Sequence, residues 1–141
     1  MNIVSNAESG LKPPINGGCS CTAIRYEISA EPMFSIICQC SQCQKITDTG
    51  HAPAIAVASD SVRMTGKLKF YSLLADDGNQ VSNGFCPGCG NPVLKKTSGY
   101  PDVLFSHVGS LDQAQGFRPE HLVYSESAQP WDNIDPKLVK P

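Results

Sequence analysis

The sequence predicts an all-β fold of short strands that bound metal ions hold together. Strand-like segments alternate with turn residues along the chain, and no segment is long enough to form a helix of a bundle. Seven cysteines fall into three tight groups whose spacing is typical of metal sites. With 141 residues, 40% hydrophobic and 17% charged, the chain is expected to form one domain with a modest core.

Strand signals recur from residue 23 onward. In residues 23–29, Ile24, Tyr26 and Ile28 alternate with charged side chains, which is typical of a half-buried strand. Further strands are expected at residues 34–38, 54–58, 62–65, 69–73, 80–85, 93–95, 103–108 and 121–124. Helical turns are expected only at residues 41–47 and 112–115.

The first residues carry neither a strand pattern nor a targeting signal. Residues 1–16 are polar and contain Pro13 and Pro14, so we expect a flexible tail followed by a zinc domain at residues 17–141. The start of the chain has no basic and apolar run of a signal peptide, and no apolar stretch is long enough to span a bilayer. Together with reduced thiols, this predicts a cytoplasmic protein.

The charge pattern argues against polyanionic partners. The formal net charge is −2, and the eleven Lys and Arg form no basic run. Two zinc ions on seven thiolates would make the charge more negative still. We therefore expect no nucleic-acid partner and no binding to an anionic membrane surface.

The cysteines form the patterns C-x-C (Cys19, Cys21), C-x-C-x-x-C (Cys38, Cys40, Cys43) and C-x-x-C (Cys86, Cys89). Sulfurs this close in sequence are poorly placed to form disulfides with each other and well placed to bind one metal ion. All-thiolate sites select zinc or iron–sulfur clusters, and zinc is the default. The last group, Cys86-Pro87-Gly88-Cys89-Gly90, is typical of a zinc knuckle.

Seven ligands divide most simply into four and three, which predicts two zinc ions per chain. Four thiolates close a structural site, whereas three leave a position open for a substrate. In one scheme, Cys19, Cys21, Cys86 and Cys89 form the closed site, and Cys38, Cys40 and Cys43 form the open one. In the other, a zinc ribbon joins Cys40 and Cys43 to the knuckle. We prefer the first scheme because three sulfurs within six residues can chelate without help from elsewhere.

His51 has two possible roles. It lies eight residues after Cys43 and could complete a structural Cys₃His site, which would make the protein a non-catalytic module that binds a protein partner. Alternatively, it is the most plausible proton carrier near an open metal. The other two histidines, His107 and His121, are expected to be structural, and Trp131 and Tyr71 are expected in the core.

Several motifs together resemble the glutathione-dependent formaldehyde-activating enzyme family. They are Gly18-Cys19-Ser20-Cys21, the run from Cys38 to Lys45, Phe85-Cys86-Pro87-Gly88-Cys89-Gly90, Val108-Gly109-Ser110-Leu111-Asp112, and His121 followed by Pro130-Trp131. The resemblance covers roughly residues 17 to 133. It implies a compact, tent-like fold of short antiparallel strands pinned by zinc, with a structural ion on Cys19, Cys21, Cys86 and Cys89 and a catalytic one on Cys38, Cys40 and Cys43.

The chain departs from the family pattern at two positions. Thr22 stands where many members have glycine, and Gln39 where many have histidine. An open zinc on three thiolates is anionic, so an anionic substrate such as glutathione would need a compensating cation. Lys45 and Arg63 are the candidates nearest in sequence.

The resemblance implies a carbon–sulfur lyase that joins or cleaves a thiol and a small aldehyde such as formaldehyde. The predicted catalytic residues are Cys38, Cys40, Cys43 and His51, and the partners are a small-molecule thiol and an aldehyde. Two alternative hypotheses are the non-catalytic zinc module and a redox protein whose third cysteine group cycles to a disulfide.

Overall fold

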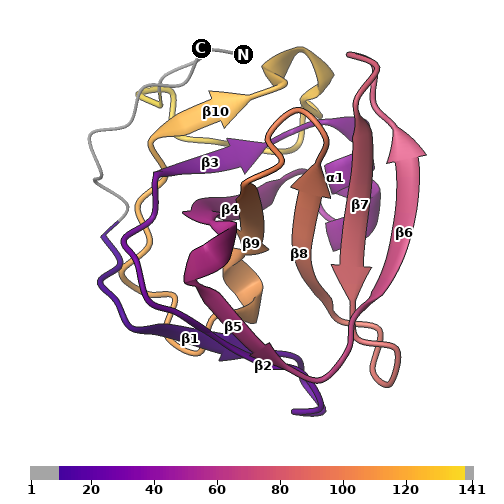
Figure 1. The fold of residues 1–141 in the computed structure, drawn as a ribbon. Helices are drawn as coiled ribbons and strands as arrows, with labels where there is room; N and C mark the ends of the chain where they lie inside the picture. Colours follow the sequence, from indigo (N-terminus) through magenta and orange to yellow (C-terminus); the bar gives the residue numbers. More distant parts are fainter. Residues whose placement is uncertain (1–9, 139–141) are drawn as a thin grey trace.

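The computed structural model describes residues 10–138 and confirms the all-β prediction. Two sheets make up the fold (Figure 1). The small sheet has the order β1-β2-β5, and the large sheet has the order β10-β3-β4-β9-β8-β7-β6. The strands are β1 (Ile15–Gly18), β2 (Arg25–Ile28), β3 (Phe34–Cys38), β4 (Ala52–Ala58), β5 (Val62–Thr65), β6 (Lys69–Leu74), β7 (Gln80–Phe85), β8 (Pro92–Thr97), β9 (Val103–His107) and β10 (His121–Val123).

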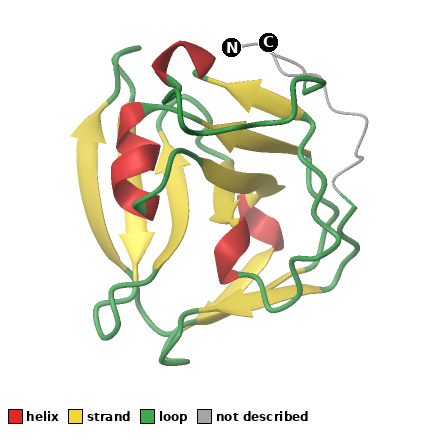
Figure 2. Cartoon of the chain, turned by 180° about the vertical axis from the view of Figure 1, so that it is seen from behind, coloured by secondary structure: helices red, strands yellow, loops and turns green. Residues whose placement is uncertain are grey.

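Helical structure is short in the described part of the chain. The α-helix α1 (Ser41–Thr47) lies where it was expected and covers the end of the large sheet that contains β6, β7 and β8 (Figure 2). Single 3₁₀ turns occupy Ser59–Ser61, Val108–Ser110 and Ser125–Ser127. No helix among residues 10–138 is long and apolar enough to cross a membrane.

Three local expectations differ from the structure. Strand β1 begins at Ile15, inside the stretch expected as a tail, because Ile15 pairs with Ile28 and its side chain is buried. Residues 1–9 of that expected tail lie outside the described residues. Residues 112–115 form no helical turn, since the Asp112 amide bonds to the Asn16 carbonyl. Strand β10 pairs with β3 in parallel, whereas the other strand pairs are antiparallel.

The large sheet has an apolar cluster on each face. Ile55 and Val57 of β4 belong to the cluster that packs against the small sheet, and Ala54 and Ala56 belong to the other. Alternate residues of β4 therefore face opposite sides of the sheet. Because both sides are covered, the strand is a nearly continuous apolar run. The second cluster contains Cys38 and Cys43, so one face of the large sheet supports the three-cysteine group.

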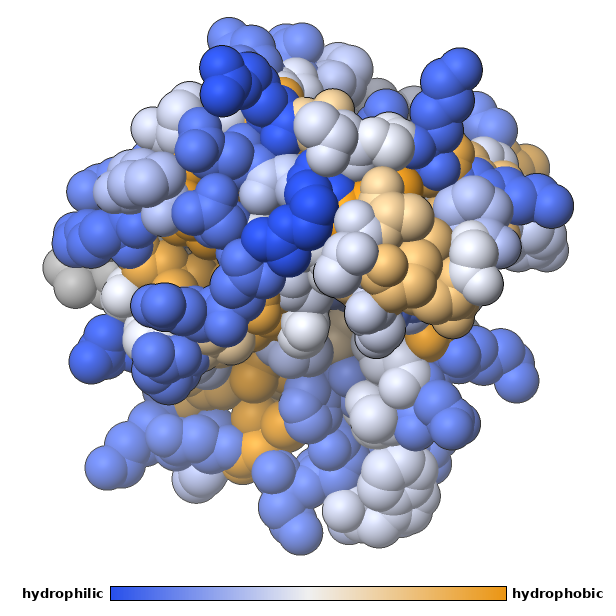
Figure 3. Space-filling model, turned by 90° about the horizontal axis from the view of Figure 1, so that it is seen from below, coloured by the Kyte–Doolittle hydropathy of each residue, from blue (hydrophilic) through white to orange (hydrophobic). Residues whose placement is uncertain are grey.

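The surface follows the usual division between polar and apolar residues. Seen from below, hydrophilic residues cover most of the molecule, and apolar residues show in patches between them (Figure 3). Trp131 and Tyr71 were expected in the core, but each is 64% exposed. Those two expectations are wrong: Tyr71 lies on β6, the edge strand of the large sheet, and Trp131 follows the last strand.

Candidate metal centres

The first candidate centre gathers four sulfurs from two distant segments. Cys19 and Cys21 follow β1, and Cys86 and Cys89 follow β7. Their four Sγ atoms all lie within 4.8 Å of one another. The Cys21 Sγ is 3.6 Å from the Cys19 Sγ and 3.6 Å from the Cys86 Sγ.

These separations match the geometry of zinc. Four thiolates at Zn–S distances near 2.3 Å form a tetrahedron whose edges are about 3.8 Å. The observed pairs at 3.6 Å are close to this edge. The donor set therefore fits one tetrahedral zinc ion and leaves no position for a further ligand.

Backbone amides orient the sulfurs of this group. The Gly88 amide donates to the Cys86 Sγ at 3.3 Å, and the Ile24 amide donates to the Cys19 Sγ at 3.3 Å. The Gly90 amide closes the knuckle on the Cys86 carbonyl at 2.8 Å, with a φ of +77° that favours glycine. Such N–H bonds stabilise thiolates without any charged side chain.

Thr22, the departure from the family pattern noted above, adopts a φ of 66°. This left-handed conformation is favourable for glycine and unfavourable for a β-branched side chain. The turn that carries Cys19 and Cys21 to the metal therefore imposes backbone strain on this chain.

The second candidate centre is built from one short segment. Cys38 ends β3, Cys40 is the N-cap of α1, and Cys43 lies in the first turn of the helix. Their Sγ atoms lie within 4.8 Å of one another, and Cys38 and Cys43 are each 2% exposed. The Cys43 amide donates to the Cys40 Sγ at 3.3 Å, so the helix start itself aims these sulfurs together.

The sulfurs thus divide into the four and three of the preferred scheme. Among the described residues, no zinc ribbon joins Cys40 and Cys43 to the knuckle. The three-sulfur group also fits a soft metal such as zinc, and it offers one ligand fewer than a closed site.

A lysine that sequence reasoning missed lies beside the second group. The Lys95 Nζ is 3.7 Å from the Cys43 Sγ and 5.4 Å from the centre of the Phe105 ring. Burial lowers the pKa of Lys95, but the nearby charge of Cys43, Cys38 and Cys40 outweighs it, so the pKa stands above its ordinary value. Lys95 therefore brings a positive charge to this centre.

The two cations nearest in sequence do not take this place. Lys45 is exposed on α1, and Arg63 lies in the small sheet, 3.9 Å from Glu27. No sequence signal distinguishes Lys95 from Lys96, its neighbour, which lies over the Phe70 ring. Only the pairing of β8 with β9, which sets Lys95 opposite Phe105, directs Lys95 to the cysteines.

The thiols of the second group differ in acidity. Hydrogen bonds from Cys38 and Cys43 to the Cys40 sulfur lower the pKa of Cys40. The pKa of Cys38 is raised, chiefly because its thiol donates to Cys40 and to Cys43.

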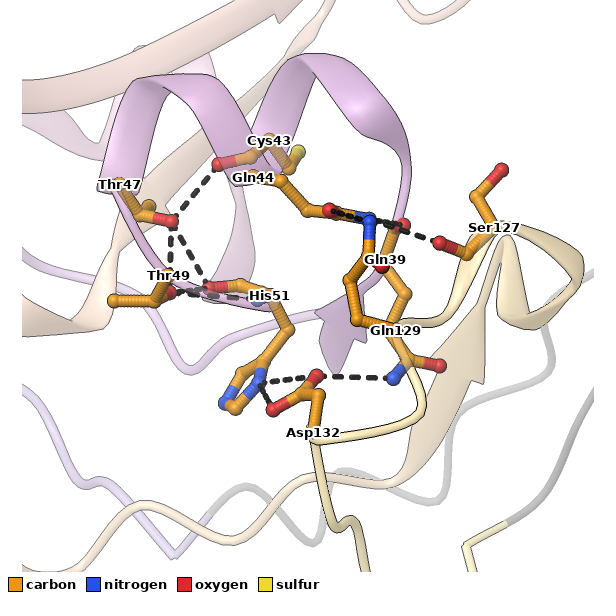
Figure 4. A network of polar contacts seen from close by, with 9 residues as sticks. All are labelled: Gln39, Cys43, Gln44, Thr47, Thr49, His51, Ser127, Gln129 and Asp132. Carbon is orange, nitrogen blue, oxygen red and sulfur yellow. Dashed lines mark hydrogen bonds and ion pairs between the residues drawn. The ribbon is translucent and has the colours of Figure 1, made fainter.

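His51 takes part in a separate polar network (Figure 4). Its Nδ1 lies 2.9 Å and 3.0 Å from the two carboxylate oxygens of Asp132, and the Gln39 Nε2 donates to Asp132 Oδ2 at 3.1 Å. The His51 ring turns toward Asp132, and the Cys43 sulfur points away from it (Figure 4). Among the described residues the metal-binding group here consists of three cysteines, so the Cys₃His site does not form.

The Asp132 network anchors the C-terminal segment to residues 38–43, which carry the three cysteines and which we call the metal loop. Gln39 is buried between Cys38 and Cys40 in the chain, and Gln44 of α1 donates to the carbonyls of Gln39 and Ser127. A side chain at Gly50 would collide with Asp132, whose carbon atoms would lie as little as 2.3 Å from the added Cβ. Gln39, where many family members have histidine, thus acts as a hydrogen-bond donor to this anchor.

Comparisons with known proteins agree with the sequence motifs. The family model described as glutathione-dependent formaldehyde-activating enzyme matches residues 14–127. No curated protein matches the sequence. A crystal structure of a Rhodobacter sphaeroides protein is similar in fold, with a TM-score of 0.56 and 22% identity over 69% of this chain and 87% of that one.

Proposed function

Because the chain belongs to the glutathione-dependent formaldehyde-activating enzyme family, we propose that it is a zinc-dependent carbon–sulfur lyase. It joins or cleaves a thiol, glutathione or a similar molecule, and a small aldehyde such as formaldehyde. The observation that carries this proposal is the division of the seven cysteines into a four-sulfur group, which is closed, and a separate three-sulfur group, which is open.

Each group receives a separate role. Cys19, Cys21, Cys86 and Cys89 hold a structural zinc, and Cys38, Cys40 and Cys43 hold a catalytic one. When bound to three sulfurs, zinc leaves one coordination position for a substrate thiol and favours its thiolate form. We expect the protein to be cytoplasmic and to bind both ions.

Lys95 makes the open centre compatible with an anionic substrate. Three thiolates and one zinc ion carry a formal charge of −1, which the Lys95 ammonium brings to zero. A fourth thiolate then gives a net charge of −1 instead of −2 within a largely buried centre. Because uncompensated charge in such surroundings is costly, Lys95 supports thiol binding there.

The chemical step is an addition. The thiolate sulfur bonds to the carbonyl carbon, the carbonyl π bond breaks, and its electron pair moves to the oxygen, which takes up the proton lost from the thiol. The product is a hemithioacetal, and the reverse steps cleave it. Lys95, whose Nζ lies 3.7 Å from the Cys43 Sγ, is the cation that we expect to stabilise the developing negative oxygen. The role of His51 as proton carrier stays a prediction.

Native mass spectrometry before and after brief exposure to a moderate chelator tests this proposal. We expect the zinc content to fall from two ions per chain to one while the fold is retained. In a separate kinetic assay, we expect zinc to accelerate the addition of a thiol to formaldehyde. Two zinc ions that leave only as the chain unfolds, with no acceleration, would instead identify a non-catalytic zinc module.

A further inference from the structure

A cavity of about 400 Å³ is lined by residues of α1 and of the strands at the β6–β8 end of the large sheet. We call it the α1 cavity. Most of its wall is apolar, formed by Ile46, Tyr71, Leu73, Phe85 and Pro92. Its size is that of sites for small organic molecules, whereas formaldehyde is a single carbonyl group that would leave it nearly empty.

Two polar side chains, Asn83 of β7 and His107 of β9, also line this cavity. Each is 7% exposed, and neither amide atom of Asn83 nor either ring nitrogen of His107 has a hydrogen-bond partner among the described residues. Buried polar groups are almost always paired, and leaving them unpaired costs free energy. Two such groups in one cavity indicate a ligand that pairs with them.

The charge of the cavity limits the ligand further. Among residues 10–138, no acidic side chain lines it, and the exposed Lys45 at its margin is the one charged group of the lining. Burial, with a smaller effect of Lys95, lowers the pKa of His107 to about 4, so the ring is neutral near pH 7. A neutral imidazole and an amide each offer one acceptor and at least one donor. The complementary ligand group is therefore an uncharged hydroxyl or amide.

The α1 cavity adjoins the three-cysteine group. Gln42 and Lys45, which line it, flank Cys43 on α1. Asn83 is paired across the sheet with Lys95, whose Nζ contacts the Cys43 Sγ. A molecule in the cavity is thus separated from the open centre by little more than the side chains of one helix turn and one strand pair.

We propose that the α1 cavity binds the skeleton of a substrate that is larger than formaldehyde, uncharged and mainly apolar, and that carries a hydroxyl or amide group for Asn83 and His107. The assignment of this skeleton to a substrate rests on the proposed lyase function. The skeleton can belong to the aldehyde or to the thiol, and the test separates the two.

The first experiment measures binding without any chemistry. Benzamide is titrated into the zinc-loaded full chain by calorimetry for the natural sequence, Asn83→Leu and His107→Phe. NMR of the His107 ring follows the same titration in the natural sequence and in Asn83→Leu. We expect each substitution to weaken benzamide binding at least tenfold while toluene binds as well or better. Ser82→Ala, next to Asn83 on the other face of β7, is the matched control and should change binding less than twofold.

The toluene measurement keeps the test valid if a variant folds poorly, because a damaged cavity would lose both ligands. No benzamide binding by the natural sequence, or equal binding by the variants, would overturn the proposal in favour of water alone at Asn83 and His107. A milder variant, Asn83→Ser, should give an intermediate loss.

A second experiment compares kcat/KM for 4-formylbenzamide with a simple thiol, and for 4-(mercaptomethyl)benzamide with formaldehyde. At least a tenfold gain over the matching compound without the amide, lost in Asn83→Leu, identifies the partner that enters the cavity. Absence of a gain in both pairs would overturn the assignment to a substrate. If benzamide binds but no thiol reacts with any aldehyde, the lyase function fails while the binding site stands.

Discussion

The two cysteine groups use the same ligand atom in opposite settings. The four-sulfur group joins segments 65 residues apart, and two of its members, Cys21 and Cys89, are exposed. Backbone amides are its hydrogen-bond donors. The three-sulfur group comes from six consecutive residues, is largely buried, and has the Lys95 ammonium beside it. The comparison teaches that the four-sulfur group connects distant segments, whereas the three-sulfur group has a cation beside it, which under the proposed function offsets the charge that a substrate would bring.

The largest expected effect is the loss of folding stability when a cysteine of the closed group is replaced. Cys86 is fully buried, so Cys86→Ser should remove the structural zinc and much of the folding free energy, since structural zinc contributes on the order of 10 kcal/mol to such sites. Cys40→Ser should lose only the second zinc and keep its fold. Circular dichroism and zinc content check this. Equal unfolding of both variants would contradict the division of roles.

The next largest effect is a change in the free energy of unfolding with pH, caused by His107 on strand β9 of the large sheet. The pKa of His107 is about 4 in the folded protein, below its ordinary value of 6.5, so the unfolded chain binds the proton more tightly. The free energy of unfolding should therefore fall as pH drops from 6.5 to 4, by about 3 kcal/mol from this group. Denaturant unfolding of the natural chain and of His107→Gln at several pH values checks this prediction. Zinc release at low pH affects both proteins, so the difference between their pH curves reports the contribution of His107. Parallel pH curves would contradict it.

Lys95 sharpens the comparison between the two centres. Lys95→Met keeps most of the side-chain volume and removes the charge, so thiol affinity and kcat/KM should fall roughly 10- to 100-fold, as for other residues that support metal ligands. Zinc content of the closed group should not change. Lys96→Met, the outward neighbour, is the control. Equal effects of the two substitutions would show that Lys95 has no special role.

His51 tests whether the Asp132 network is catalytic or structural. Because the ring bonds to Asp132 and turns away from Cys43, His51→Gln should lower stability by about 1 kcal/mol and activity less than tenfold. Thermal unfolding and the pH profile of kcat/KM measure the two effects. A 100-fold loss with an altered pH profile would instead identify His51 as the proton carrier.

The smallest effect lies in the turn of the closed group. Thr22→Gly removes the strain of a β-branched residue at a φ of 66° and should raise the free energy of unfolding by up to about 1 kcal/mol. Chemical denaturation measures it, and Thr65→Gly, at an exposed position of strand β5, should lower the free energy of unfolding instead. A loss of stability in Thr22→Gly would mean that the threonine side chain outweighs its backbone strain.

Local spacing predicted much of this molecule. The bounds of β3, α1, β5 and β7 agree with the strand and helix signals, because alternation and capping act over a few residues. The three-sulfur group also follows from spacing, since C-x-C and C-x-x-C place sulfurs together at a strand end and helix start. Strand β1 escaped prediction because Ile15-Asn16-Gly17-Gly18 has a weak pattern and pairs only through β2.

The sequence by itself determined the number of sulfurs, their two kinds of spacing and the all-β class, because each depends on neighbours along the chain. The tertiary structure decided which lysine meets Cys43, which acid holds His51, and that Asn83 and His107 share one cavity. These contacts depend on the order β4-β9-β8-β7 and on the return of the C-terminal segment to the metal loop. Sheet order brings residues far apart in the chain to one face, and no local pattern encodes that order.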